Sequence, residues 1–360
     1  MFQQTKLPRW RGFNLMGMFM KSSCPGHFDE EDFQLISDWG FNFVRLPLSY
    51  RFWIKDEDPF RIDEDLLAPI DQAVLWGEKY GIHVNIGFHR GPGYCIHDLP
   101  GNKEPFSLWT DDEALNCYIL HWVTFAKRYK GSSADKVSFN MLNESARVSP
   151  EAHSRVMRAA TKAIHEISPE RICLVDGLGG GNYPMAELGD LAKENVAQSC
   201  RGYIPSGISH YRAPWVDKEG KFPYPVWPNG LQGDEVWSLE RLDNHYKAWA
   251  AMAEAFHMGV HCGEGGSNHN CPHEVGLRWL DDLLCILKSY NIGYAQWNFT
   301  GDFGVLDSGR RDVAYEEYKG HLLDRQMLDI LRKYSDEDHR LSQREIGEIL
   351  KTEYGMTADR

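Results

Sequence analysis

The feature that most constrains the fold of this chain is a unit that recurs along it: a short apolar strand, a polar loop and an amphipathic helix. Eight candidate strands follow this pattern, at residues 11–15, 41–47, 83–89, 137–142, 172–176, 207–210, 260–262 and 292–297. Helical patterns occupy 29–39, 66–80, 110–129, a segment beginning at the Ser149-Pro150 N-cap, 238–258 and 272–290. Eight strands that alternate with helices predict an α/β protein with a (β/α)8 TIM barrel.

We expect the 360 residues to form a single catalytic domain, with a barrel core over about 9–320 and a helical tail over about 321–360. The main competing architecture is a doubly wound open sheet. Such a sheet usually has a glycine fingerprint after its first strand, and Leu15-Met-Gly-Met-Phe-Met is not one. The stretch 212–237 is rich in Pro, Trp and Tyr without periodicity, and it is interpreted as a long loop.

Two candidate strands end in a carboxylate. Val137-Ser-Phe-Asn-Met-Leu runs into Asn143-Glu144, and Gly259-Val-His-Cys-Gly runs into Glu264. An acid at the end of a buried strand is partly desolvated, which raises its pKa toward that of a proton donor near neutral pH. Asn143 carries both a donor and an acceptor that can hold a substrate hydroxyl beside that acid. Two carboxylates of this kind are what a glycosidase needs.

Charge and composition limit the classes of molecule that this protein is expected to bind. The net charge of -13 argues against nucleic acid, because a polyphosphate is repelled by most of such a surface. No apolar run approaches the length of a membrane span, so no membrane partner is expected. The 12 Trp and 16 Tyr residues slightly favour carbohydrate, whose apolar faces stack on flat rings.

The N-terminus has no apolar segment typical of a signal peptide. The sequence therefore predicts a cytoplasmic protein if Met1 is the native start, and a secreted one if a leader has been removed. The 8 cysteines are scattered singly and are interpreted as reduced thiols of the core.

No metal or cofactor is predicted. His261, Cys262, His269, Cys271 and His273 are potential zinc ligands, but their spacing fits no closed tetrahedral pattern. The run Asp176-Gly-Leu-Gly-Gly-Gly lacks the Lys-Ser/Thr of a phosphate-binding loop, and it is interpreted as a permissive backbone turn.

The polar residues at the expected strand ends, taken in order, resemble glycoside hydrolase family 5, the cellulase-type family of clan A. The matching stretches are Phe-Val-Arg45-Leu-Pro, Gly-Phe-His89-Arg-Gly-Pro-Gly, Leu-Asn143-Glu144, His210-Tyr211, Gly-Glu264 and Gln-Trp297. Each stretch alone is a weak signal, whereas the ordered set is specific.

The resemblance implies a retaining double displacement with Glu144 as acid/base and Glu264 as nucleophile. It also implies that Arg45 stabilises the anion of Glu264 and that Tyr211 donates a hydrogen bond to the same carboxylate. Asn143 is expected to hold the sugar 2-hydroxyl. His89 and His210 would line the subsite of the cleaved sugar, and Trp297 would stack beneath its ring.

These features predict a β-glycosidase that acts on β-linked gluco- or manno-configured oligo- or polysaccharides, with exo action on short chains as one possibility. The loop 212–237 would then close one end of the cleft. Two alternatives from other classes stay open: a zinc-dependent hydrolase on the same barrel, and a carbohydrate-binding barrel without activity.

Overall fold

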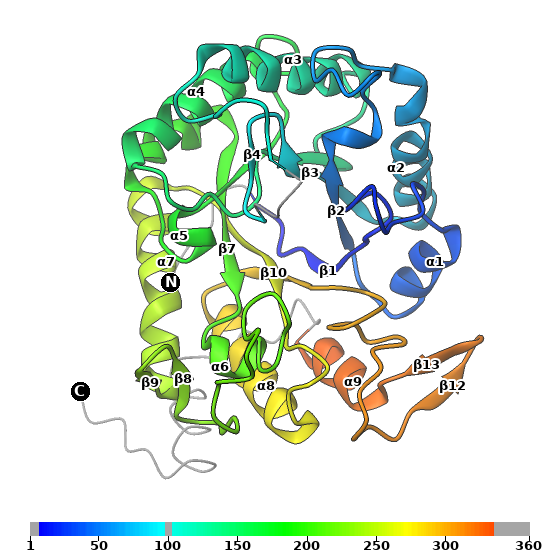
Figure 1. Ribbon diagram of the computed structural model, residues 1–360, viewed down its shortest axis with the longest axis vertical. Coiled ribbons are helices and arrows are strands. Elements are labelled where there is room, and N and C mark those ends of the chain that lie inside the picture. Colours follow the sequence, from blue (N-terminus) through cyan, green and yellow to red (C-terminus); the bar gives the residue numbers. More distant parts are fainter. Residues whose placement is uncertain (1–6, 98–102, 335–360) are drawn as a thin grey trace.

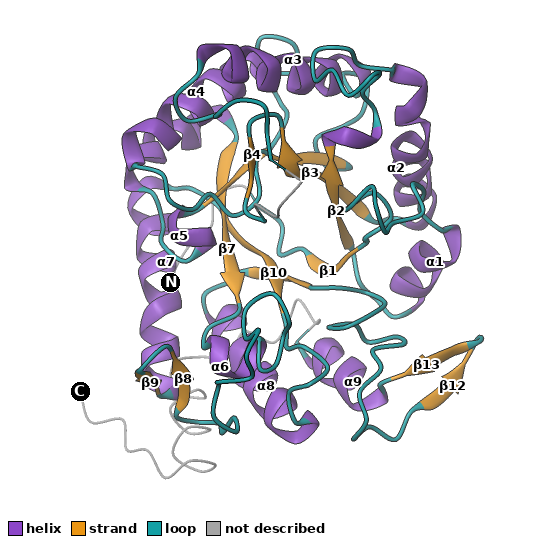
Figure 2. Ribbon diagram, in the orientation of Figure 1, coloured by secondary structure: helices purple, strands orange, loops and turns teal. Residues whose placement is uncertain are grey.

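The computed structural model describes residues 7–97 and 103–334. Its centre is a closed parallel barrel, in which β1 pairs with both β2 and β11 and the β2–β3 pairing completes the ring. The eight barrel strands are β1 (Arg11–Asn14), β2 (Phe43–Ser49), β3 (His83–Gly91), β5 (Val137–Asn140), β6 (Cys173–Asp176), β7 (Val196–Gly202), β10 (Val260–Gly265) and β11 (Gly293–Gln296). The predicted TIM barrel is confirmed, and Figure 2 shows the strands at the centre with the helices outside them.

Helices follow most of the strands and surround the barrel (Figure 1). They are α1 (Glu30–Asp38), α2 (Ala68–Tyr80), α3 (Asp112–Arg128), α4 (Pro150–His165), α5 (Leu178–Gly181), α6 (Ser206–Ser209), α7 (Leu239–Phe256), α8 (His273–Ser289) and α9 (Arg325–Lys333). Short 3-10 turns cover Tyr50–Phe52, Glu64–Leu67 and Ala186–Glu194. No helix within 7–97 and 103–334 combines the length and apolar character that crossing a membrane requires.

The start of α4 shows how local sequence sets an element boundary. The Ser149 hydroxyl accepts a hydrogen bond from the Ala152 N–H at 3.2 Å, and Pro150 occupies the first helical position. Pro suits that position because the N–H it lacks would have no partner inside the helix. This helix begins where the sequence predicts it.

The core lies between the barrel and the helices. Every residue of β2, β3 and β10 is buried, as expected for parallel strands covered on both faces. Phe88 of β3 stacks on Trp122 of α3 with ring centroids 3.9 Å apart, which joins the barrel wall to its outer layer. The eight cysteines are all free thiols.

The predicted sixth strand is wrong. Residues 206–209 form the short helix α6, and the sixth barrel strand is β7, Val196–Gly202. β7 reads Val-Ala-Gln-Ser-Cys-Arg-Gly, so it lacks the continuous apolar run of a buried strand. Gln198, Ser199 and Arg201 are nevertheless buried, and the polar groups of each make hydrogen bonds inside the protein.

Three further segments contain strands that the sequence does not predict, the first being β4 (Tyr94–Cys95), which pairs antiparallel with the end of β3. The expected helical closure after Tyr315 begins with a hairpin of β12 (Glu316–Tyr318) and β13 (His321–Leu323), and only then enters α9. The end of the loop 212–237 forms a second hairpin, β8 (Gly230–Gln232) with β9 (Glu235–Trp237). The rest of the expected tail, 335–360, lies outside the described residues. Both hairpins lie at the periphery of the molecule in Figure 2.

Candidate active site

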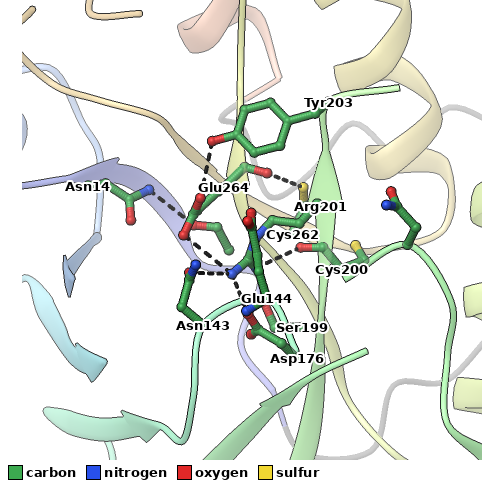
Figure 3. Close-up of polar contacts among 12 residues, drawn as sticks. Asn14, Asn143, Glu144, Asp176, Ser199, Cys200, Arg201, Tyr203, Cys262 and Glu264 are labelled. Carbon is green, nitrogen blue, oxygen red and sulfur yellow. Dashed lines mark hydrogen bonds and ion pairs between the residues drawn. The ribbon is translucent and has the colours of Figure 1, made fainter. Parts of the chain in front are cut away.

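The carboxyl ends of the barrel strands bring Glu144 and Glu264 to one guanidinium. Glu264 belongs to β10 and Glu144 lies in the loop after β5; Glu144 accepts a hydrogen bond from Arg201 of β7, and Glu264 forms an ion pair with the same guanidinium. The distances are 2.9 Å from Arg201 Nε to Glu144 Oε1 and 3.3 Å from Arg201 Nη2 to Glu264 Oε1. Figure 3 shows Arg201 between the two carboxyl groups. The two predicted carboxylates are therefore neighbours.

Glu264 is held as an anion. Its side chain is 3% exposed, and Oε1 accepts from Arg45 Nη1 at 2.6 Å. Its other oxygen, Oε2, accepts from the Tyr203 hydroxyl at 3.1 Å. Burial and the nearby carboxylates of Glu264 and Glu144 raise the pKa of Tyr203, so its hydroxyl stays protonated and donates. Since two guanidinium groups face this carboxylate, its charge is compensated although it is buried.

Arg45, in the middle of β2, organises this part of the site. Besides Glu264, its guanidinium donates to the side-chain oxygens of Asn140 at 2.8 Å, Asn14 at 3.0 Å and Asn143 at 2.9 Å. Gly87 on the adjacent strand leaves room for it, since a Cβ there would lie 3.3 Å from Arg45 Nε. The planar fork of donors is fixed by four acceptors, which come from β1, from β5 and the loop after it, and from β10.

The backbone of Glu144 is strained and is held by two side chains. Its φ angle is 49°, in the left-handed region that non-glycine residues rarely adopt. The Glu144 N–H donates to Asp176 Oδ2 at 2.8 Å, and its carbonyl accepts from the Tyr94 hydroxyl at 2.8 Å. That hydroxyl also accepts from the Ala146 N–H at 2.8 Å. Strain that is stabilised on both sides indicates a functional position.

The two carboxyl groups have different electrostatic surroundings. The Glu144 side chain is 18% exposed, against 3% for Glu264. Burial, followed by repulsion from the Glu264 carboxylate, raises the pKa of Glu144 to about 8, although Arg201 opposes the increase. Glu144 is therefore suited to carry a proton near neutral pH while Glu264 remains ionised.

Asn143 offers a donor to the site. Its oxygen accepts from Arg45 Nη2 and from Arg201 Nη2, each at 2.9 Å. Its Nδ2 is buried and has no hydrogen-bond partner among the described residues. Because the oxygen is held by two guanidiniums, the orientation of the amide is fixed and an N–H remains for a ligand.

His89 and Trp297 stack on each other, with ring centroids 5.7 Å apart and planes inclined by 24°. Both ring nitrogens of the buried His89 lack a partner among the described residues. Burial, His97 and the nearby arginines lower the pKa of His89, so the ring is neutral, with one donor and one acceptor. The pair thus combines hydrogen-bonding nitrogens with an aromatic surface.

His210 and Tyr211 require correction, because they do not follow a strand. His210 ends the short helix α6, and its Nδ1 lies 2.8 Å from the Ser209 hydroxyl. The hydrogen bond to Glu264 that was expected from Tyr211 is made by Tyr203 instead. Tyr211 packs against Tyr224 with ring centroids 6.4 Å apart. His210 still lies near the site, because it lines the larger cavity described next.

Two adjoining cavities share Arg90, Cys95 and His97, and Glu144 lines the larger of them. The larger, about 620 Å³, is lined by Glu144, His210 and the aromatic rings of Tyr94, Phe106, Trp109 and Trp215, among others. The smaller, about 290 Å³, is lined by His89, Phe19 and Arg51, among others. Ligand sites commonly have this combination of apolar rings with a few polar groups.

Sequence reasoning missed three residues of the site. Arg201 and Tyr203 were missed because the strand was placed at 207–210, and Asp176 because its glycine-rich context suggested only a turn. The available signal was Arg201-Gly-Tyr203 itself: a cation and an aromatic hydroxyl immediately after a short run of strand length. Asp176 receives hydrogen bonds from Asn140, Arg201 and the Glu144 backbone, so it anchors the loop that carries Glu144.

The histidines and cysteines considered above as potential zinc ligands make other contacts in the structure. His273 Nε2 lies 2.7 Å from Asp324 Oδ2, and His261 packs on Phe43 with ring centroids 4.7 Å apart. Cys262 Sγ donates to the Glu264 carbonyl at 3.4 Å. Across the part of the chain that the structure describes, no group of three or more His, Cys, Asp or Glu side chains is arranged to hold a metal ion.

Comparison with known proteins agrees with this geometry. A family model described as cellulase, glycosyl hydrolase family 5, matches residues 3–302. Endoglucanase C of Acetivibrio thermocellus is 26% identical over 335 residues, covering 85% of this chain and 95% of the relative. Cellodextrinase A of Ruminococcus flavefaciens is 25% identical over 300 residues, covering 78% of this chain and 83% of the relative.

Solved structures give the same result. A crystal structure described as a glycoside hydrolase superposes with a TM-score of 0.85 at 35% identity, covering 91% of this chain and 99% of the other. A hyperthermophilic endo-β-1,4-glucanase, solved with substrate, shares the fold with a TM-score of 0.72 at 20% identity, covering 90% and 96% of the two chains. The family match extends over most of the chain and includes both glutamates, so this chain belongs to glycosyl hydrolase family 5 and is a glycoside hydrolase.

Proposed function

We propose that this family 5 hydrolase is a retaining β-glycosidase that cleaves β-linked gluco- or manno-configured oligosaccharides by double displacement. Glu264 is the nucleophile and Glu144 the general acid and base. The observation that carries the proposal is the contrast between two neighbouring carboxyl groups. Glu264 is surrounded by Arg45, Arg201 and Tyr203 as an anion, whereas burial raises the pKa of Glu144 to about 8.

In the first step the Glu264 carboxylate attacks the anomeric carbon, and Glu144 gives its proton to the departing glycosidic oxygen. In the second step Glu144 removes a proton from water, which attacks the same carbon and releases Glu264. Retaining enzymes need one protonated and one ionised carboxyl group, roughly 5–5.5 Å apart. The bonding of both groups to Arg201 supports this assignment.

The remaining polar groups suit a sugar ring between the two carboxyl groups. The unpartnered Nδ2 of Asn143 is placed to donate to the 2-hydroxyl, a contact that strengthens in the oxocarbenium-like transition state. The ring nitrogens of His89 would bind further hydroxyls, and Trp297 would stack on the apolar face of the ring. His210 would contact the sugar from the larger cavity.

The substrate is proposed to be short. Trp215 and Val216, from the long loop after α6, line the larger cavity together with Glu144, so this loop forms part of the wall of the site. The relatives include both an endoglucanase and a cellodextrinase, so their names agree on a β-glucan substrate class and differ on chain length. We infer a preference for oligosaccharides attacked near a chain end.

The chemistry is tested with aryl β-glycosides of gluco, manno and xylo configuration, hydrolysed by wild type, Glu264→Ala and Glu144→Ala in the presence of azide. Glu264→Ala is expected to form the α-glycosyl azide, because azide attacks the face that the missing nucleophile occupied. Glu144→Ala is expected to form the β-glycosyl azide from the intact glycosyl-enzyme. The same azide anomer from both variants would refute the role assignment.

Chain-end preference is tested separately with cellohexaose and mannohexaose labelled at the reducing end. Products one or two sugars long, released before intermediate lengths accumulate, are expected. Internal cleavage at a comparable rate would refute exo action while leaving the carboxylate roles intact.

A further inference from the structure

Arg201 is the most connected side chain of the site, yet the family pattern read from the sequence gives it no role. It lies in β7 and is 1% exposed. Its guanidinium donates to Glu144, Asn143, Ser199 and the carboxylate of Asp176, and it forms an ion pair with Glu264. Figure 3 shows these contacts converging on one group.

We propose that Arg201 is a positioning residue of the reaction, which determines which oxygen of each catalytic carboxyl group takes part in bond making and proton transfer. This inference rests on the proposed retaining mechanism and concerns the same site. It assigns atoms where the family resemblance assigns only residues.

On Glu144, Arg201 selects the oxygen that carries the proton. Oε1 accepts from Arg201 Nε at 2.9 Å, so its lone pair is directed at a donor that never loses its own proton. Oε2 has no hydrogen-bond partner among the described residues. The transferable proton therefore resides on Oε2, and the same atom takes a proton from water in the second step.

On Glu264, the arginines select the attacking oxygen. Two guanidinium nitrogens contact Oε1: Arg45 Nη1 at 2.6 Å and Arg201 Nη2 at 3.3 Å. Among the described residues, Oε2 accepts a hydrogen bond only from the Tyr203 hydroxyl, at 3.1 Å. Charge-assisted bonds withdraw electron density from the oxygen that accepts them. Oε2 therefore forms the bond to the anomeric carbon as the glycosidic bond breaks, and its electron pair returns when water displaces the sugar.

Arg201 also balances charge around the acid. The titratable groups that face Glu144 come from several elements: Glu264 on β10, Arg201 on β7, Asp176 on β6, Tyr94 on β4 and Tyr203 after β7. Asp176 is fully buried and paired with Arg201. Removing the cation leaves Asp176 without its guanidinium partner and Glu264 with Arg45 alone, so negative charge beside Glu144 increases, whereas neutralising Asp176 leaves the cation in excess. These two changes shift the titration of Glu144 in opposite directions.

The test uses Arg201→Gln, Arg201→Lys and Asp176→Asn in the full-length protein. Arg171→Gln is the matched control, because Arg171 is equally buried but donates to backbone carbonyls, including those of Tyr129 and Ser132. Two readouts are taken: kcat/KM against pH for a neutral aryl β-glycoside, and carboxyl ¹³C shifts of labelled glutamate, with Glu144 assigned by Glu144→Gln.

In Arg201→Gln the titration of Glu144 is expected to move up by about 1 pH unit, and in Asp176→Asn it is expected to move down by a similar amount. Arg201→Lys keeps the charge but has no planar fork, so it is expected to leave the titration near that of wild type while kcat falls at least about tenfold. Arg171→Gln is expected to lower stability without moving the titration.

Shifts in the same direction for Arg201→Gln and Asp176→Asn, or an Arg201→Lys enzyme with wild-type kcat, would overturn the proposal. If Arg201→Gln does not fold, Arg201→Lys and Asp176→Asn still decide the question. If wild type hydrolyses no β-glycoside, the proposed function fails. The ¹³C titration still measures whether Arg201 and Asp176 act on Glu144 in opposite directions.

Discussion

At the scale of single residues, the two glutamates differ because different strands surround them. Glu264 faces two guanidinium groups and a tyrosine hydroxyl, which stabilise its charge. Glu144 lines the larger cavity, and burial, followed by repulsion from the Glu264 carboxylate, raises its pKa. The proposed division of labour between acid and nucleophile thus rests on the neighbours of the two glutamates, since the side chains themselves are chemically identical.

The value of kcat/KM is expected to fall at alkaline pH, because the proposed general acid loses its proton there. Glu144 acts as an acid only when protonated and its pKa is about 8, so kcat/KM is full below that pH and falls as pH rises through it. A pH series with a neutral aryl β-glycoside measures this alkaline decrease in kcat/KM. The Glu144→Gln variant is expected to show no such decrease, and an unchanged decrease in that variant would mean that another group titrates.

Tyr203 and Tyr211 provide a matched pair. Tyr203→Phe removes the hydroxyl that donates to Glu264, so kcat/KM is expected to fall by about 10- to 100-fold, in line with a hydrogen bond to a charged group. Tyr211→Phe removes a hydroxyl that has no bond to Glu264 and is expected to change kcat/KM by less than about threefold. Equal losses in the two variants would contradict the placement of β7.

At the scale of elements, the sequence predicts strands well where their composition is uniformly apolar. Both carboxylates, Asn143 and His89 lie at or near the strand ends where the pattern places them, whereas Arg45 lies in the middle of β2 (Phe43–Ser49). β7 escapes prediction because barrel strands also point side chains into a polar interior. Gln198 bonds to Met185 and Arg201 to Asp176, outside the strand, while Ser199 bonds to Arg201 within it, and no local apolar pattern records such contacts.

A bulge in β10 positions Glu264. Between Cys262 and Glu264 the strand advances two residues while β7 advances one, from Cys200 to Arg201. The extra residue is Gly263, and such a bulge redirects the side chains that follow it. Glu264 is thereby paired directly with Arg201 across the two strands.

Gly263→Ala is expected to disturb this bulge. The added Cβ would lie 2.6 Å from Ser199 Oγ and 3.2 Å from Arg201 Nη1. Overpacking of this kind typically costs about 1–3 kcal/mol, and we expect kcat/KM to fall at least about tenfold because Arg201 is displaced. Denaturant unfolding and kinetics measure the two effects. Ser199→Ala in the same chain should recover part of the stability, and no recovery would place the clash elsewhere.

At the scale of the whole molecule, closure of the barrel creates the site. Arg45 joins side chains from β1, β2, β5 and β10, and Arg201 adds β6 and β7. The strands between them must therefore be paired before the carboxyl groups meet. The site can therefore form only when the ring of strands is closed.

Gly12 tests this requirement directly, because a Cβ there would lie 1.6 Å from the Phe43 carbonyl oxygen on the paired strand β2. Gly12→Ala is expected to lower the free energy of unfolding by at least about 3 kcal/mol, measured by denaturant titration. Gly131→Ala is the control, since nothing lies within 4 Å of its added Cβ. A Gly12→Ala protein as stable as the control would show that β1 and β2 separate without consequence.

The order of the strands along the chain has a consequence for fragments of this protein. A cut between α4 and β6 leaves Glu144 and Arg45 on one piece, and Asp176, Arg201 and Glu264 on the other. Each piece then holds one of the two glutamates and one of the two arginines, so under the proposed mechanism neither can perform a double displacement alone. Hydrolysis returns only if the two half-barrels reassemble, and the enzyme would then report, by turnover, the association of any two proteins fused to its halves.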